Sequence, residues 1–111
     1  MITQRVRDHC LTKPGAWLDE PWEGDLVAKV ADKIFAFLGD TTVGLKCGRD
    51  ADDGAELRAR YPDDVTISAY IGRYGWNTLR LDGAIAAEEI FEAVDRSYDA
   101  VVAGLPKSKR P

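Results

Sequence analysis

The chain has 111 residues, of which 45% are hydrophobic and 31% charged, and its net charge is −4. This size is typical of one compact domain, no apolar run is long enough to cross a bilayer, and the N-terminus lacks the apolar stretch of a signal peptide. The acidic balance disfavours binding to nucleic acid through the charge of the whole molecule. We therefore expect one soluble, cytoplasmic domain over residues 1–111, with residues 106–111 as a mobile basic tail.

The first half of the chain predicts one helix and four strands. Residues 3–12 have an amphipathic pattern, and the proline of the following KPGA cannot continue a helix. Short strand-like runs separated by turn-forming clusters follow, at residues 16–22, 26–31, 33–38 and 42–47. Connections this short join antiparallel neighbours.

The second half predicts a helix, two strands and a final helix. Residues 50–60 form a weak helix that contains Gly54, and residues 65–71 and 76–81 read as strands joined by GRYG. Apolar side chains recur at helical spacing across residues 86–104. The order of elements indicates an α+β fold, with a largely antiparallel sheet of about six strands and helices packed on one face.

Side-chain alternation divides the expected sheet into two faces. The set directed toward the helices is mostly aliphatic: Leu26, Ala28, Val30, Val43, Leu45, Cys47, Val65, Ile67, Ala69, Ile71, Asn77, Leu79 and Leu81. The outer face then carries basic and aromatic side chains without an acid in the middle of any strand: Lys29, Lys46, Tyr70, Trp76 and Arg80, which Lys33, Phe35 and Phe37 can join.

This outer pattern has two interpretations. Cations attract phosphates and aromatic rings stack on unpaired bases, so the pattern indicates a nucleic-acid-binding face. Exposed strands also favour aromatic and β-branched residues and use lysine to discourage edge pairing, so cross-strand packing alone explains the same residues. Both interpretations stay open at this point.

Catalytic and metal-binding patterns are weak. Cys10 and Cys47 form no CxxC pair, which is typical of free thiols in a reducing compartment. His9 and Cys10 are adjacent on a helix and so point in different directions, and no P-loop, GxGxxG or GxSxG motif is present. Acidic residues on the last helix could collect divalent cations weakly, although a solvated helix face is the better interpretation. We expect no cofactor and no enzymatic activity.

Seven segments occur in order along nearly the whole chain: KPGAW, EPW, KVADKIFAFL, LKC, ELRARYP, GWNTLRLDG and SYDAVVAGLPK. Together they resemble the MmcQ/YjbR-like family of small bacterial proteins. The resemblance implies a frataxin-like (CyaY-like) α+β fold, and members of the family are described as predicted DNA-binding proteins of a "double wing" type. Among the matching positions, Ser97 and Tyr98 are expected to tie the last helix to the sheet.

The leading hypothesis is a non-catalytic protein that binds DNA or another nucleic acid through the outer face. The candidate residues are Lys29, Lys33, Lys46, Tyr70, Arg73, Trp76, Asn77 and Arg80. The alternatives are a protein-interaction module and a frataxin-like weak metal binder. Frataxins carry an acidic ridge on their first helix, whereas this helix region is basic through Arg5, Arg7 and Lys13. A monomer without a membrane partner is expected.

Overall fold

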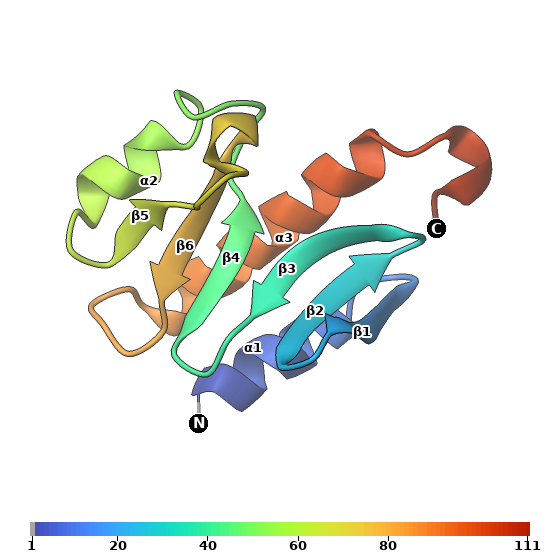
Figure 1. Ribbon diagram of the computed structural model, residues 1–111, viewed down its shortest axis with the longest axis horizontal. Coiled ribbons are helices and arrows are strands. Elements are labelled where there is room, and N and C mark those ends of the chain that lie inside the picture. The colour runs from blue at the N-terminus through green and yellow to red at the C-terminus, as the bar shows by residue number, and fades with distance from the viewer. Residues whose placement is uncertain (1) are drawn as a thin grey trace.

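The computed structural model describes residues 2–111, and its elements follow the predicted order (Figure 1). The first half contains α1 (Ile2–Leu11), β1 (Ala16–Trp22), β2 (Asp25–Val30), β3 (Lys33–Leu38) and β4 (Thr42–Lys46). The second half contains α2 (Ala55–Arg60), β5 (Val65–Ile67), the 3-10 turn η1 (Gly72–Tyr74), β6 (Trp76–Arg80), α3 (Ala87–Ala103) and the 3-10 turn η2 (Lys107–Lys109).

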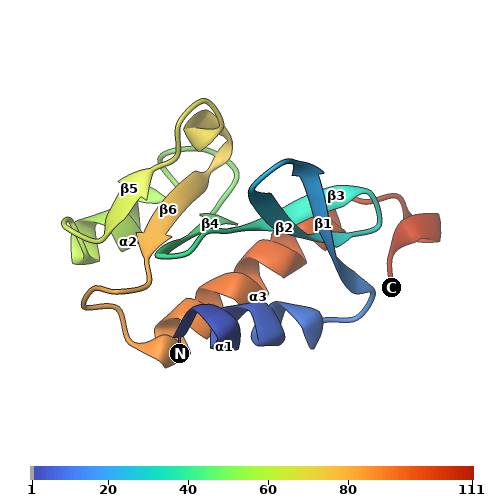
Figure 2. The same ribbon diagram turned by 60° about the horizontal axis from the view of Figure 1, so that its bottom comes forward.

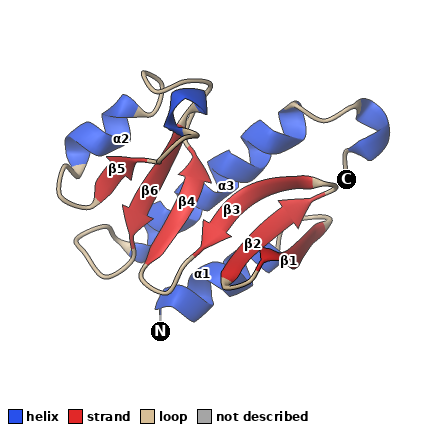
Figure 3. Cartoon of the chain, viewed as in Figure 1, coloured by secondary structure: helices blue, strands red, loops and turns tan. Residues whose placement is uncertain are grey.

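The six strands form one antiparallel sheet in the order β1-β2-β3-β4-β6-β5. Figure 3 shows the strands in front of α1 and α3, and Figure 2 shows these two helices side by side beneath the sheet. The predicted α+β class, with helices on one face of an antiparallel sheet, is confirmed. Its frataxin-like label stays a prediction.

The core lies between the inner face of the sheet and the two long helices. Its fully buried side chains come from both layers: Val6, Cys10, Val30, Phe35, Val43, Leu45, Leu79, Ile90 and Val94. Burying one such aliphatic or aromatic side chain stabilises the fold by about 1.5–3 kcal/mol. The same burial raises the pKa of the Cys10 thiol to about 12, so this thiol stays neutral in the core.

Ser97 of α3 joins the helix to the sheet at the place where β3 and β4 separate. Its fully buried hydroxyl donates to the Phe35 carbonyl at 2.5 Å and accepts from the Lys46 N–H at 2.9 Å. The last recorded pair of these strands is Ala36 with Leu45, so Phe35 and Lys46 would form the next pair. The Ser97 hydroxyl therefore stands between two backbone groups that could otherwise bond directly.

The prediction that Ser97 ties the last helix to the sheet is confirmed. Tyr98 instead donates its hydroxyl to the Pro14 carbonyl, in the turn that precedes β1. Ser97 thus anchors α3 to β3 and β4, and Tyr98 anchors it to the turn before β1. Because one anchor lies inside the sheet and the other at its edge, α3 is held against the inner face in one orientation.

The expectation that Phe35 joins the outer face is wrong. Ala28 pairs with Ala36 but Lys29 pairs with Ile34, so β3 contains one extra residue at this point, a β-bulge. The bulge interrupts the alternation of side chains and turns Phe35 into the core, where its ring meets Tyr98 edge to face at 5.3 Å. The outward position of Phe37 is unaffected because it lies beyond the bulge.

Two predicted boundaries are also wrong. The helix expected over residues 50–60 begins only at Ala55, because Asp50 and Asp53 accept bonds from nearby backbone N–H groups and form turns instead. The strand expected over residues 65–71 ends at Ile67, and Ile67 itself is half exposed. Ser68 still donates its N–H to the Trp76 carbonyl, and residues 69–71 form a turn with Tyr70 in the left-handed conformation at φ 64°.

The C-terminal residues run back toward the body of the protein. Lys107–Lys109 form η2, and Arg110 donates to the carbonyls of Ala103 and Leu105 at 3.0 and 2.9 Å. The Ala103 carbonyl lies in the last turn of α3, where carbonyl groups have no helical partner, so Arg110 supplies the missing hydrogen bond. The mobility expected of residues 106–111 stays a prediction.

Candidate nucleic-acid interface

The outer face of the sheet is concave. Figure 2 shows β1 and β2 rising at one end and β5, β6 and η1 rising at the other, with β4 low between them. A groove of about 340 Å³ lies here and is lined by Phe37, Gly44, Ser68 and Thr78, among others. Gly44 makes room for the ring opposite it, because a Cβ at this position would lie 3.2 Å from the Cβ of Phe37.

A second hollow opens where β3 and β4 separate, and we call it the notch. It has a volume of about 270 Å³ and is lined by Lys33, Ile34, Lys46, Trp76, Ala100, Val101 and Gly104. Ala100 and Val101 belong to the last turns of α3 and Gly104 is its C-cap, and together they form an apolar floor behind the strands. The notch therefore combines an apolar floor, one indole ring and two lysines, and its lining includes no acidic residue.

Three of the predicted site residues, Lys33, Lys46 and Trp76, meet at the notch. Lys46 and Trp76 are direct cross-strand partners, and the Lys46 ammonium donates to the Tyr74 carbonyl. Lys33 is exposed at the start of β3 and has no ion-pair partner within residues 2–111. Both ammonium groups thus reach solvent without a carboxylate that would neutralise them.

Trp76 and Phe37 connect the two hollows. Their rings meet edge to face with centroids 5.4 Å apart, Phe37 lines the groove and Trp76 lines the notch. Such an aromatic pair is a rigid apolar surface, since each ring restricts the rotation of the other.

Lys29 and Arg80 lie on the outer face as predicted but are engaged by acids. Lys29 forms a 2.7 Å ion pair with Asp19 of the neighbouring strand and lies over the Trp17 ring at 5.2 Å. Arg80 pairs with Asp82 at 3.1 Å. The sequence predicted no acid in the middle of any strand, but Asp19 lies in the middle of β1. The positive charges of Lys29 and Arg80 are therefore largely neutralised.

Tyr70 and Arg73 lie on the segment that rises beside the groove. Tyr70 is 97% exposed and belongs to a turn, so its expected place on a strand is wrong. Arg73 stands over the Tyr74 ring at 4.8 Å, which holds its guanidinium beside the loop that also accepts the bond from Lys46. Gly75 ends η1 at φ 91° and turns the chain directly into β6 and Trp76.

Asn77 does not belong to the interface, because it is fully buried on the inner face. Its amide donates to the Gly54 carbonyl at 3.0 Å and accepts from the Arg58 guanidinium at 2.8 Å. Asn77 therefore holds the start of α2 against β6, and its role is structural. Its position between Trp76 and Thr78 follows the predicted alternation, which already directed it toward the helices.

Sequence reasoning missed the floor of the notch. Ala100, Val101 and Gly104 belong to a helix whose apolar side chains were all assigned to the core. The available signal was the pair of small residues Ala100 and Gly104, one helical turn apart, because small side chains on a buried stripe leave room above them. The separation of β3 from β4 above that floor depends on the buried Ser97 hydroxyl and had no separate signal.

A six-stranded antiparallel sheet, with two helices on one face and a basic-aromatic notch on the other, defines a small α+β domain with a structured open face. The YjbR family model matches residues 11–100. The chain is 31% identical over 116 residues to "Uncharacterized protein YjbR" of Escherichia coli K12, across 99% of this chain and 95% of that protein. The chain therefore belongs to the MmcQ/YjbR family, as its sequence segments indicated.

Solved structures share this fold. The crystal structure of Deinococcus radiodurans protein DR2400 superposes with a TM-score of 0.81 at 26% identity, over 96% of this chain and 83% of that one. A Pseudomonas syringae protein superposes with a TM-score of 0.71 at 22% identity, over 87% of this chain and 96% of that one. At this level of identity the second likeness supports the fold alone.

Two further properties bear on the alternatives. Across residues 2–111, no helix combines the length and the apolar character needed to span a bilayer. Within the same residues, no three His, Cys, Asp or Glu side chains come together in a group that could hold a metal ion. The frataxin-like metal-binding alternative therefore finds no supporting cluster in the described part of the chain.

Proposed function

We propose that this protein is a non-catalytic, cytoplasmic nucleic-acid-binding protein that uses the notch and the adjoining groove. One observation carries the proposal: Lys33, Lys46 and Trp76 meet at a single hollow whose lining contains no acid, in a chain with a net charge of −4. Unneutralised lysines attract phosphate, and the Trp76 ring offers a surface for base stacking. The positive charge is local, and at physiological ionic strength salt screens the opposing charge of acidic residues that lie more than about 8 Å away.

The geometry favours a single strand over a duplex. A notch of about 270 Å³ beside an aromatic pair suits one unstacked base, whereas the bases of a duplex stay inside the stack. The cations near the notch that have no acidic partner within residues 2–111 include Lys33, Lys46 and Arg73. With about two or three phosphate contacts, the slope of log affinity against log salt should be about −1.5 to −2 for a single strand.

Fluorescence anisotropy of a labelled single-stranded oligonucleotide, compared with the matching duplex, tests the proposal. We expect binding at low salt, preference for the single strand, and about tenfold weaker binding of the Lys46→Glu variant. Lys109→Glu is the matched control, since this substitution changes the charge by the same amount but lies in η2, outside the notch lining. Equal loss in both variants, or no binding at low salt, would refute the proposal.

The protein-interaction alternative is favoured by a different surface. β1 is an edge strand, and its residues Trp17 and Trp22 are 43% and 58% exposed. Large exposed aromatic side chains are enriched at protein interfaces. If this alternative holds, a pull-down at moderate salt recovers one stoichiometric partner protein. Trp22→Ala should lose this partner, whereas Lys46→Glu should retain it. Equal recovery of the partner by both variants would count against the alternative.

A further inference from the structure

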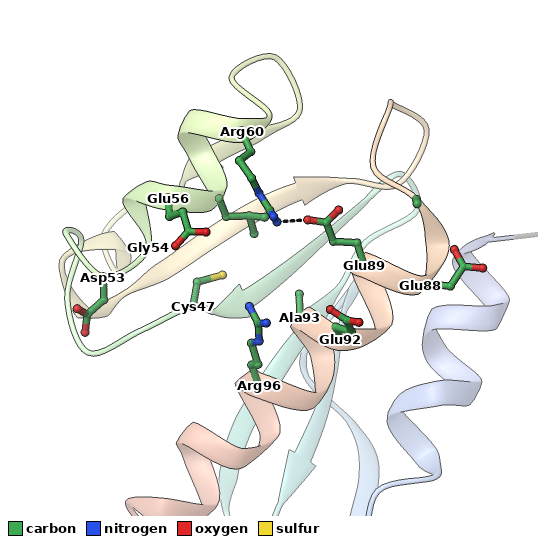
Figure 4. A pocket seen from close by; sticks show the side chains of 12 residues that line it. Cys47, Asp53, Gly54, Glu56, Arg60, Glu88, Glu89, Glu92, Ala93 and Arg96 are labelled. Atoms are coloured by element: carbon green, nitrogen blue, oxygen red, sulfur yellow. Dashed lines mark hydrogen bonds and ion pairs between the residues drawn. The ribbon is translucent and has the colours of Figure 1, made fainter.

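A pocket of about 460 Å³ lies between α2 and the first half of α3. This volume falls within the range of about 300–1,000 Å³ that is usual for small-molecule sites. Figure 4 shows side chains from both helices and from the end of β4 around it. Leu57, Ala86 and Ala93 provide apolar wall, while most of the other lining residues are charged.

One side of the pocket is positively charged. Figure 4 shows the Cys47 thiol and the Arg96 guanidinium pointing into the space between the helices. Burial raises the pKa of Cys47, against the opposing effect of nearby Arg58 and Arg96, so the thiol is uncharged at neutral pH and neutralises neither. Arg58 donates only to the neutral oxygens of Asn77 and Ala51. Within residues 2–111, neither guanidinium has a carboxylate partner.

The opposite charge lies on the flanks of the same pocket. Glu89 is engaged by the Arg60 guanidinium and by the Tyr61 hydroxyl. Glu56 of α2 and Glu92 of α3 also line the pocket, and neither has an ion-pair partner within residues 2–111. The pocket thus holds the Arg96 guanidinium and the Glu92 carboxylate one helical turn apart on α3, with the Glu56 carboxylate on α2 and apolar surface from Leu57 and Ala93.

The presence of both kinds of charge in one pocket decides between kinds of ligand. A simple anion that reached Arg96 would also meet the field of Glu56 and Glu92, and a simple cation would meet the field of Arg96. A molecule that carries both charges on one end can pair with the guanidinium and with a carboxylate together. Bound metal is disfavoured because no suitable ligand group occurs within residues 2–111.

We propose that this pocket binds a small zwitterion with an apolar body, of the class of free α-amino acids. The ligand carboxylate pairs with Arg96, its ammonium group faces Glu56 and Glu92, and its side chain lies against Leu57 and Ala93. The pocket is independent of the nucleic-acid interface, because none of its lining residues belongs to the notch or the groove.

L-phenylalanine and two analogues that each lack one charge provide the test. Phenethylamine lacks the carboxylate, and 3-phenylpropionate lacks the ammonium group. The readout is the rate at which iodoacetamide alkylates Cys47, located by mass spectrometry, because a ligand in the pocket covers this thiol. Cys10 is fully buried and serves as the internal control, since only unfolding exposes it. We expect L-phenylalanine to protect Cys47 at a concentration about tenfold lower than either analogue requires.

Arg96→Gln tests the assignment of the carboxylate. Arg96 is exposed and forms no ion pair within residues 2–111, so this variant should fold normally. Protection by L-phenylalanine should weaken about tenfold in Arg96→Gln and stay unchanged in the matched control Arg73→Gln, which lies outside the pocket. Equal protection by all three compounds, no protection by any, or an unchanged Arg96→Gln would each overturn the proposal.

Discussion

Ser97→Ala removes the hydroxyl that bridges β3 and β4 and leaves one buried and one partly buried backbone group without a partner. The hydroxyl accepts from the Lys46 N–H and donates to the Phe35 carbonyl, and its own side chain is fully buried. Alanine fills nearly the same space but can do neither. The perturbation therefore tests hydrogen bonding with little change in packing.

The expected loss of unfolding free energy is about 2–6 kcal/mol. A buried donor or acceptor that loses its partner costs about 1–3 kcal/mol, and here one donor and one acceptor are affected. A domain of this kind is typically stable by only about 5–15 kcal/mol. The single hydroxyl thus accounts for a substantial part of the stability, and the notch should be the first place to loosen.

Urea unfolding of the wild type and Ser97→Ala measures this loss, with amide hydrogen exchange at Lys46 as a local readout. Ser68→Ala is the matched control, because its hydroxyl contacts only the half-exposed Thr78 and should cost under about 1 kcal/mol. If Ser97→Ala also costs under about 1 kcal/mol and Lys46 stays protected, β3 and β4 have closed and bonded directly. That result would refute the idea that Ser97 is needed where the strands separate.

Asn77→Ala should lower stability by about 2–4 kcal/mol in urea, because the Gly54 carbonyl and the Arg58 guanidinium both lose a hydrogen-bond partner. Acid should weaken the contact between α1 and α3. Burial acts to raise the pKa of Asp95, but hydrogen bonds from His9 and Lys13 outweigh it and hold that pKa below its ordinary value. The stabilisation by ionised Asp95 is therefore present above about pH 4 and disappears as the pH falls through the folded-state pKa. Unfolding curves of wild type and Asp95→Asn at neutral and acid pH should show this loss.

Each of these two expectations has a clear contrary result. If Asn77→Ala weakened oligonucleotide binding at a concentration of urea where the variant is still folded, the residue would belong to the interface after all. For Asp95, the side chain is 40% exposed, so the difference should stay under about 1 kcal/mol. A wild type that lost no more stability than Asp95→Asn between neutral and acid pH would contradict the assignment.

The sequence alone determined the kinds of elements and the two faces of the sheet. Element type follows from local periodicity, and side-chain alternation follows from strand geometry, so both can be read from neighbouring residues. Asn77 and Leu79 lie inward and Trp76 lies outward, as that alternation predicts. The family was likewise readable, since its segments occur in order along the chain.

Only the tertiary structure decided how those residues combine into sites. The bulge that turns Phe35 inward depends on pairing between β2 and β3, and the notch depends on a helix residue, Ser97, that lies 62 positions away from Phe35. The pocket beside Cys47 likewise needs α2 and α3 to meet. Local patterns predict which way a side chain points, but a cavity is formed by segments distant in sequence, and their distance and register are set by packing.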